Sequence, residues 1–167
     1  MAEIVDKQDL LEKIRPFSPL RRVLLATPGT LQATLSAFFG TAIGVRVKRQ
    51  QEAAGTLLRT VSLILPDLEL EVCSASTKAR VTDPPMRRLL RERTLGIGRI
   101  AAMLGANASF RLDDAGEDTT TFWRVYQLWG AGFHYRIREA FPRSLYPDGV
   151  RWNVARPEDV VRNVPTI

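Results

Sequence analysis

The chain has 167 residues, of which 45% are hydrophobic, and this is enough for one domain around a single core. Its 24 Lys and Arg residues against 18 Asp and Glu give a net charge of +6, which permits anion binding without demanding a nucleic acid. One cysteine and one histidine exclude an internal disulfide and a Cys/His metal cluster, so we expect no metal and no cofactor.

The N-terminus, Met-Ala-Glu-Ile-Val-Asp-Lys-Gln-Asp, is acidic and lacks the basic-then-apolar order of a signal peptide. No apolar run approaches the roughly 20 residues that a membrane-spanning helix needs. We therefore expect a cytoplasmic protein that has no membrane partner.

The first forty residues have the pattern of a helical hairpin. Helices are predicted at residues 5–14, 18–25 and 30–39 from their apolar stripes. Each begins at a residue type that caps helices, and these are Asp6, Ser18 and Thr30. Gly40 is expected to stop the third helix.

From residue 41 the apolar period changes to two, which predicts strands at residues 41–48, 56–65 and 68–79. Two further strands, at residues 120–129 and 133–141, are joined by Gly130-Ala131-Gly132, a hairpin signal. The acidic stretch 113–118 is expected to be a solvated loop. These elements predict an α+β fold with a single antiparallel sheet of five or six strands and helices covering one face.

The whole chain, residues 1–167, is interpreted as one domain. Its core is expected at about residues 17–142, followed by a C-terminal tail at 143–167 with little periodicity. The densest basic stretch, residues 86–93, fits a helix whose arginines face solvent. Because no nucleic-acid motif accompanies it, we expect no nucleic-acid partner.

Two charged residues stand where strand alternation predicts apolar side chains. In residues 133–141 the period of two places Glu139 with the aromatic and aliphatic residues of the strand. In residues 56–65 the same rule places Arg59 with leucine and valine. Because burying an unpaired ion costs several kcal/mol, each needs a partner, and together they suggest a site for a polar, anionic small molecule.

Two other interpretations remain open from the sequence. Arg59 and Glu139 could form a structural salt bridge with no ligand between them. A register error of one residue would instead return both charges to solvent.

Three segments together resemble the chorismate pyruvate-lyase family, or 4-hydroxybenzoate synthases. The first, residues 17–30 (Phe-Ser-Pro-Leu-Arg-Arg-Val-Leu-Leu-Ala-Thr-Pro-Gly-Thr), is similar to the family's leucine-rich opening. The second joins residues 57–63 (Leu-Leu-Arg-Thr-Val-Ser-Leu) to the later turn 95–99 (Leu-Gly-Ile-Gly-Arg). The third, residues 135–142 (Tyr-Arg-Ile-Arg-Glu-Ala-Phe-Pro), resembles the strand that carries the family's glutamate.

The resemblance implies a chorismate lyase-like fold and elimination of pyruvate from chorismate without a cofactor. It assigns substrate contacts to Arg59 and Glu139, which would be the catalytic residues, and to the backbone near Ile97. Gly29 aligns with a further ligand-contacting turn, and helical flaps would cover a buried pocket.

The physical chemistry of these residue types agrees with that role. An arginine fork binds a carboxylate in a bidentate, orienting manner, and a carboxyl group on an apolar face could hold a proton to donate. Two alternatives are kept: a non-catalytic, effector-sensing domain of the same fold, or a diverged biosynthetic enzyme for another carboxylated substrate.

Other chemistry-bearing residues are expected to be structural. His134 falls on the opposite strand face from Glu139, and Cys73 is expected to be a small buried hydrophobe. Trp123, Tyr126 and Trp129 are expected to be core and rim aromatics, with lining of a pocket as the alternative.

Overall fold

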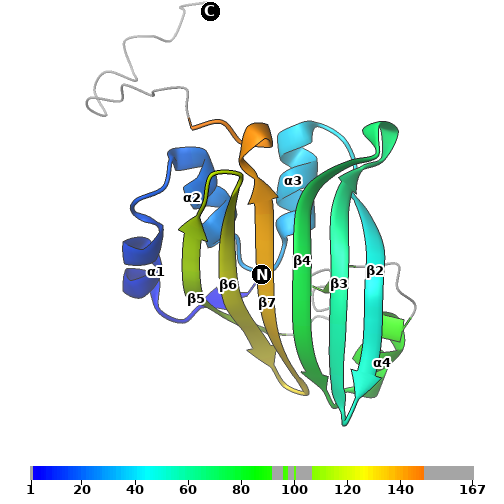
Figure 1. Ribbon diagram of the computed structural model, residues 1–167. Helices are drawn as coiled ribbons and strands as arrows, with labels where there is room; N and C mark the ends of the chain where they lie inside the picture. Colours follow the sequence, from blue (N-terminus) through cyan, green and yellow to red (C-terminus); the bar gives the residue numbers. More distant parts are fainter. Residues whose placement is uncertain (1, 92–95, 98–99, 101–106, 149–167) are drawn as a thin grey trace, which may run out of the picture.

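The computed structural model describes residues 2–91, 96–97, 100 and 107–148 as one seven-stranded sheet with helices on one side (Figure 1). The strand order is β1-β5-β6-β7-β4-β3-β2. The strands are β1 (Glu3–Ile4), β2 (Gly44–Ala53), β3 (Thr56–Leu65), β4 (Leu70–Val81), β5 (Ser109–Glu117), β6 (Thr121–Gly130) and β7 (Phe133–Pro142). The helices are α1 (Lys7–Ile14), α2 (Pro19–Ala26), α3 (Leu31–Phe39) and α4 (Pro84–Arg91), with 3-10 turns η1 (Pro66–Leu68) and η2 (Arg143–Leu145).

The predicted α+β class is confirmed, but the predicted sheet of five or six antiparallel strands is wrong in two respects. The sheet is larger, and it is mixed, because β1 pairs with β5 in parallel. The expected loop at residues 113–118 is mostly strand: β5 continues to Glu117. A register shift between Leu112 and Asp114 interrupts the alternation of apolar and polar residues, and this explains why the sequence pattern did not predict a strand in the acidic half.

The helix starts differ from expectation in their capping. Asp6 Oδ1 accepts a hydrogen bond from the Asp9 backbone N–H at 2.9 Å, so the predicted cap of α1 is confirmed. Ser18 and Thr30 precede α2 and α3 but make no side-chain capping bond. Gly40 ends α3 with φ of 67°, a backbone conformation that glycine tolerates best.

The hairpin of β6 and β7 lies at the predicted glycine-rich turn, but it closes through two residues, Ala131 and Gly132, because Gly130 belongs to β6; Gly132 has φ of 77°. Its register places Arg124 directly opposite Glu139. Every second residue of both strands is buried toward the helices, while the intervening residues face away from them. The sheet therefore has a helix-covered inner face and a helix-free outer face (Figure 1).

Strand β2 forms one edge of the sheet. A register shift between Val47 and Arg49 marks a bulge in its pairing with β3. The cations of this edge are exposed, and Arg46 and Lys48 each form an ion pair with a glutamate near the start of β4, Glu69 or Glu71, at 2.6 Å. In the part of the chain that the structure describes, no helix is long and apolar enough to cross a membrane.

Cys73 lies in β4 with 0% of its surface exposed, which confirms its prediction as a buried residue. Burial raises the pKa of its thiol well above the ordinary value. Because the thiolate is the reactive form, we expect a chromogenic disulfide reagent to leave Cys73 unmodified in the folded protein and to react after guanidinium unfolding. Rapid stoichiometric labelling of the native protein would show that the strand is not packed as described.

Candidate functional site

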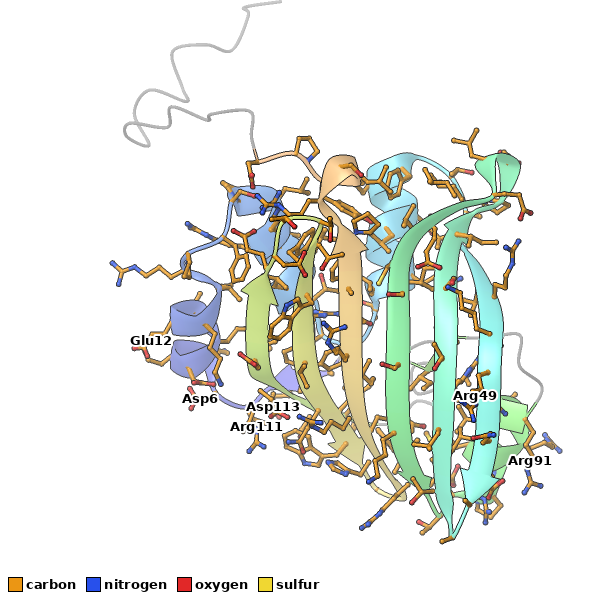
Figure 2. All side chains as sticks on the ribbon, in the orientation of Figure 1. Asp6, Glu12, Arg49, Arg91, Arg111 and Asp113 are labelled. Atoms are coloured by element: carbon orange, nitrogen blue, oxygen red, sulfur yellow. The ribbon has the colours of Figure 1, made fainter. Side chains whose placement is uncertain are left out.

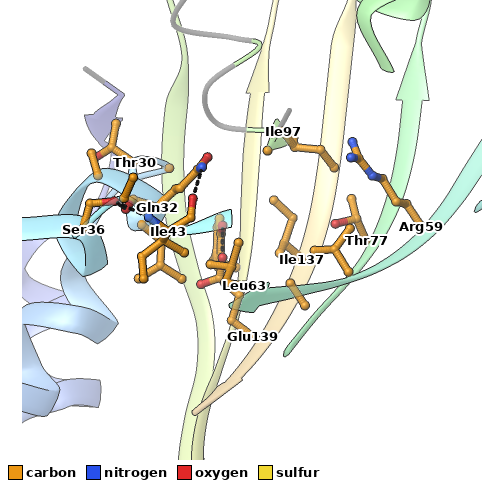
Figure 3. A pocket seen from close by; sticks show the side chains of 18 residues that line it. Thr30, Gln32, Ser36, Ile43, Arg59, Leu63, Thr77, Ile97, Ile137 and Glu139 are labelled. Atoms are coloured by element: carbon orange, nitrogen blue, oxygen red, sulfur yellow. Dashed lines mark hydrogen bonds between the residues drawn. The ribbon is translucent and has the colours of Figure 1, made fainter. Parts of the chain in front are cut away.

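A cavity of about 560 Å³ lies between the inner face of the sheet and α3 (Figure 3). Its walls come from β3, β4, β6 and β7, from the start of α3, and from the segments at residues 42–43 and 96–97. Most lining residues are apolar, among them Leu63, Ile137 and Ile43. The size and the largely apolar wall are typical of a site for a small metabolite.

All four residues proposed from the sequence line this cavity: Arg59, Glu139, Ile97 and Gly29. Arg59 is 3% exposed and Glu139 is 5% exposed, so the burial predicted from strand alternation is confirmed for both. The alternative of a one-residue register error is therefore wrong. The structure thus brings together residues from positions 29 to 139, far apart in the chain.

The alternative of a structural Arg59–Glu139 salt bridge is also wrong. Glu139 forms its ion pair with Arg124, whose Nε donates to Oε2 at 2.6 Å. Arg59 and Glu139 come from β3 and β7, with β4 between them (Figure 3). Arg59 aligns across β4 with Ile137, two residues before Glu139, so the two charges mark separate points on the cavity wall.

Arg124 is the functional residue that the sequence reasoning missed. It is 0% exposed, and its Nη1 donates hydrogen bonds to the carbonyl oxygens of Leu24, Leu25 and Thr27 at 2.7–2.9 Å. These carbonyls belong to the C-terminal end of α2, where helix geometry leaves acceptors unsatisfied and favours a cation. Arg124 therefore ties Glu139 to the connection between α2 and α3.

Tyr126 completes the hydrogen bonding of Glu139. Its hydroxyl donates to Glu139 Oε1 at 3.0 Å, and the Arg124 guanidinium lies 4.5 Å from the centre of its ring. Tyr126 is 2% exposed and lines the cavity, as the alternative interpretation of the hairpin aromatics allowed.

The protonation of these two neighbours follows from their surroundings. Burial lowers the pKa of Arg124, but the charge and hydrogen bond of Glu139, together with Tyr126 and Cys73, outweigh it, so the pKa of Arg124 lies above its ordinary value. Burial, reinforced by the charge of Glu139, raises the pKa of Tyr126 well above its ordinary value. Arg124 is therefore a cation and Tyr126 a neutral donor at neutral pH. Each oxygen of Glu139 accepts a hydrogen bond, Oε2 from Arg124 and Oε1 from Tyr126.

The start of α3 forms another part of the cavity wall. Gly29 adopts φ 79°, and a Cβ added there would meet Leu128 at 3.4 Å, so this turn favours glycine. Leu31, Gln32 and Ala33 of the first helical turn also line the cavity. Because Thr30 does not cap this turn with its side chain, the positive end of the helix is available to an anion.

Gln32 and Ser36 fix the segment before β2 against α3. Gln32 Nε2 donates to the Ile43 carbonyl at 2.6 Å, and Ser36 Oγ accepts from the Ile43 N–H at 3.1 Å (Figure 3). In the described part of the chain, the buried Gln32 Oε1 accepts no hydrogen bond. It can therefore accept one from a bound hydroxyl group.

The remaining candidates lie elsewhere. His134 is exposed on the outer face, as predicted, with Nε2 2.8 Å from Gln127 Oε1. Of the predicted turn at residues 95–99, Gly96 and Ile97 line the cavity, while Arg99 and the end of the tail, residues 149–167, lie outside the described residues. Among the residues described, no three His, Cys, Asp or Glu side chains gather as metal ligands would.

No protein-family model matches this chain, and the comparison with curated proteins finds no match.

Proposed function

We propose that the chain is an enzyme of the chorismate lyase type, which eliminates pyruvate from chorismate and leaves 4-hydroxybenzoate. The observation that carries this proposal is the arrangement of the cavity. A buried arginine and a buried, doubly hydrogen-bonded carboxylate stand at separate points of one largely apolar wall. The resemblance of residues 17–142 to that family supports the same assignment.

The cavity holds groups that suit an anionic substrate. Glu139 is already paired with Arg124, and Arg59 is a cation of the lining whose guanidinium can bind a carboxylate. In our proposal the Arg59 fork binds one substrate carboxylate, and the N–H groups at the start of α3 receive the other. Ile97, 9% exposed, would cover the ring with its side chain and offer its backbone to the substrate.

The reaction needs a proton to move between two carbon atoms of the substrate. The ether bond between the ring and the enolpyruvyl group breaks, and the ring carbon that bears the hydroxyl loses its proton, so the ring becomes aromatic. The enolpyruvate methylene carbon takes up one proton and becomes the methyl group of pyruvate. We assign this transfer to Glu139, which accepts the proton and returns it, while Arg124 and Tyr126 hold its carboxylate in place.

The ion pair of Glu139 with Arg124 favours one alternative function. A carboxylate already neutralised by a buried cation can serve binding alone, so a non-catalytic, effector-sensing domain of this fold is the second candidate. A diverged enzyme for another carboxylated substrate would use the same wall. For the enzyme we propose a cytoplasmic location and neither membrane nor nucleic acid as a partner of the reaction.

The deciding experiment is incubation of the purified chain with chorismate in buffer that contains a chelator and no added cofactor. Pyruvate release is followed with a coupled assay, and 4-hydroxybenzoate by its absorbance. Equal amounts of both products support the lyase. Tight binding of 4-hydroxybenzoate without turnover would favour the sensing domain, and activity that appears only with a divalent ion would contradict the cofactor-free mechanism.

Replacement of Arg59 by lysine should weaken the binding of 4-hydroxybenzoate at least tenfold, because a planar bidentate donor becomes a point charge. The fold should survive, since a cation remains in the same place. Calorimetric titration measures the affinity, and thermal melting measures the stability of the fold. Arg111→Lys, at an exposed position of β5, is the control. Unchanged affinity together with a much lower melting temperature would mean that Arg59 has a structural role.

A further inference from the structure

The outer face of the sheet carries a second hollow that the proposed reaction does not use. It has a volume of about 490 Å³ and crosses β2, β3, β4, β7 and β6 on the face that has no helix. We call it the outer groove. The polar side chains on this face of the groove are Arg49, Gln51, Thr60, Ser76, Lys78, Arg136 and Arg138.

The cations of the outer groove stand unusually close together. Lys78 of β4 and Arg136 of β7 are directly opposite each other in the antiparallel register. The next pair on the same face of the sheet, two residues along each strand, is Ser76 and Arg138. Like charges directly opposite on neighbouring strands destabilise a sheet. Such an arrangement is favourable only when an anion offsets the repulsion.

Protein carboxylates provide little of that offset. Arg49 donates to the neutral side-chain amide of Gln51 at 3.0 Å. The carboxylate of Asp113 lies 3.7 Å from Arg136 Nε, but it also accepts hydrogen bonds from Arg111 and Gln127. Within the described ranges, Lys78 and Arg138 have no carboxylate at ion-pair distance, and no acidic residue lines the groove. Figure 2 shows Arg49 on the β2 side of the sheet and Asp113 on the β5 side, at opposite ends of this face.

We propose that the outer groove binds a small molecule that carries phosphate or pyrophosphate groups. Four cations and the hydroxyl groups of Thr60 and Ser76 offer donors from several directions, which suits the oxygens of a compact polyanion.

The aromatic surroundings disfavour a single-stranded nucleic acid, which needs open rings for base stacking. The guanidinium of Arg138 covers the Trp123 ring at 5.3 Å, and Gly116 packs so closely that an added Cβ would lie 2.5 Å from that ring.

The outer groove and the cavity lie on opposite faces of the same strands, and Arg59, Thr77 and Ile137 border both. One row of paired residues across β3, β4 and β7 consists of Arg59, Thr77 and Ile137. The adjoining row, one residue along each strand, contains Lys78 and Arg136. Because successive side chains of a strand point to opposite faces, the two rows serve opposite faces of the sheet. The phosphate site can therefore be present whether or not the cavity performs the proposed reaction.

Inorganic pyrophosphate is the probe for this site, titrated calorimetrically into the full chain at low ionic strength. The double variant Lys78→Gln/Arg138→Gln should raise the dissociation constant at least tenfold. The control Arg46→Gln/Arg88→Gln removes the same number of charges from exposed positions outside the groove and should change the dissociation constant less than twofold. Removing like charges should leave the melting temperature of the first variant equal or higher, so loss of binding is not loss of fold.

Four results would overturn the proposal. Wild-type protein could fail to bind pyrophosphate, or both double variants could lose affinity equally, which would show attraction to net charge alone. Displacement of pyrophosphate by 4-hydroxybenzoate, with loss of binding in Arg59→Lys, would place the probe in the cavity. Binding of a short single-stranded oligothymidylate through Lys78 and Arg138, with no pyrophosphate binding, would make the partner a nucleic acid instead.

Discussion

Replacing Arg124 with methionine should lower the free energy of unfolding by about 3–5 kcal/mol, because the change leaves Glu139 as a buried charge without its cation. It also removes the donor that binds the carbonyl oxygens of Leu24, Leu25 and Thr27. Methionine is similar in length and apolar, so loss of packing volume contributes little. Guanidinium unfolding at neutral pH measures the difference.

Arg138→Met is the matched control, since Arg138 lies on the next strand and faces solvent, and its loss should change stability by less than about 1 kcal/mol. A second variant, Arg124→Met with Glu139→Leu, should recover much of the loss, because both charges of the buried pair are then gone. If Arg124→Met were as stable as the wild type, the pair would not hold α2 to the sheet.

The Glu139→Gln variant should reduce turnover of chorismate about a hundredfold while the affinity for 4-hydroxybenzoate changes little. The amide keeps the shape of the carboxyl group and can accept from Arg124, but it cannot take up and return a proton. Steady-state kinetics separate kcat from KM, and product titration gives the affinity.

Glu12→Gln, at an exposed position of α1 where the Glu12 carboxylate accepts a hydrogen bond from Gln8, is the control for loss of a negative charge. A variant that melts lower but turns over normally would assign Glu139 to structure alone.

Strand alternation was enough to predict that Arg59 and Glu139 are buried, because burial alternates along β7 and, in β3, from Leu57 to Thr60. The same rule applied to residues 121–130 places Arg124 with Phe122 and Tyr126 on the buried face. A three-residue turn, Gly130-Ala131-Gly132, would pair Trp129 with Phe133 and set Arg124 opposite Arg138, whereas the structure pairs Gly130 with Phe133 and sets Arg124 opposite Glu139. The sequence therefore indicates that Arg124 is buried, but its ion-pair partner came from the structure.

Other features depend on long-range contacts that leave little trace in local sequence. Strand β1 has two residues and exists by pairing with Ser109 and Phe110. The bulge in β5 hides its acidic half from a periodicity test. The three carbonyls that Arg124 binds are about a hundred positions away in the chain, so no pattern near residue 124 shows them.

The edge formed by β2 affects how molecules of this protein meet one another. An edge strand offers unpaired backbone groups to any strand that approaches, and an open, flat edge leads to end-to-end growth of sheets. Here the bulge between Val47 and Arg49 distorts the edge, and Arg46, Lys48 and Arg49 place cations along it. A second copy that approached with its own β2 would bring like charges together. This edge should therefore resist aggregation even at high protein concentration.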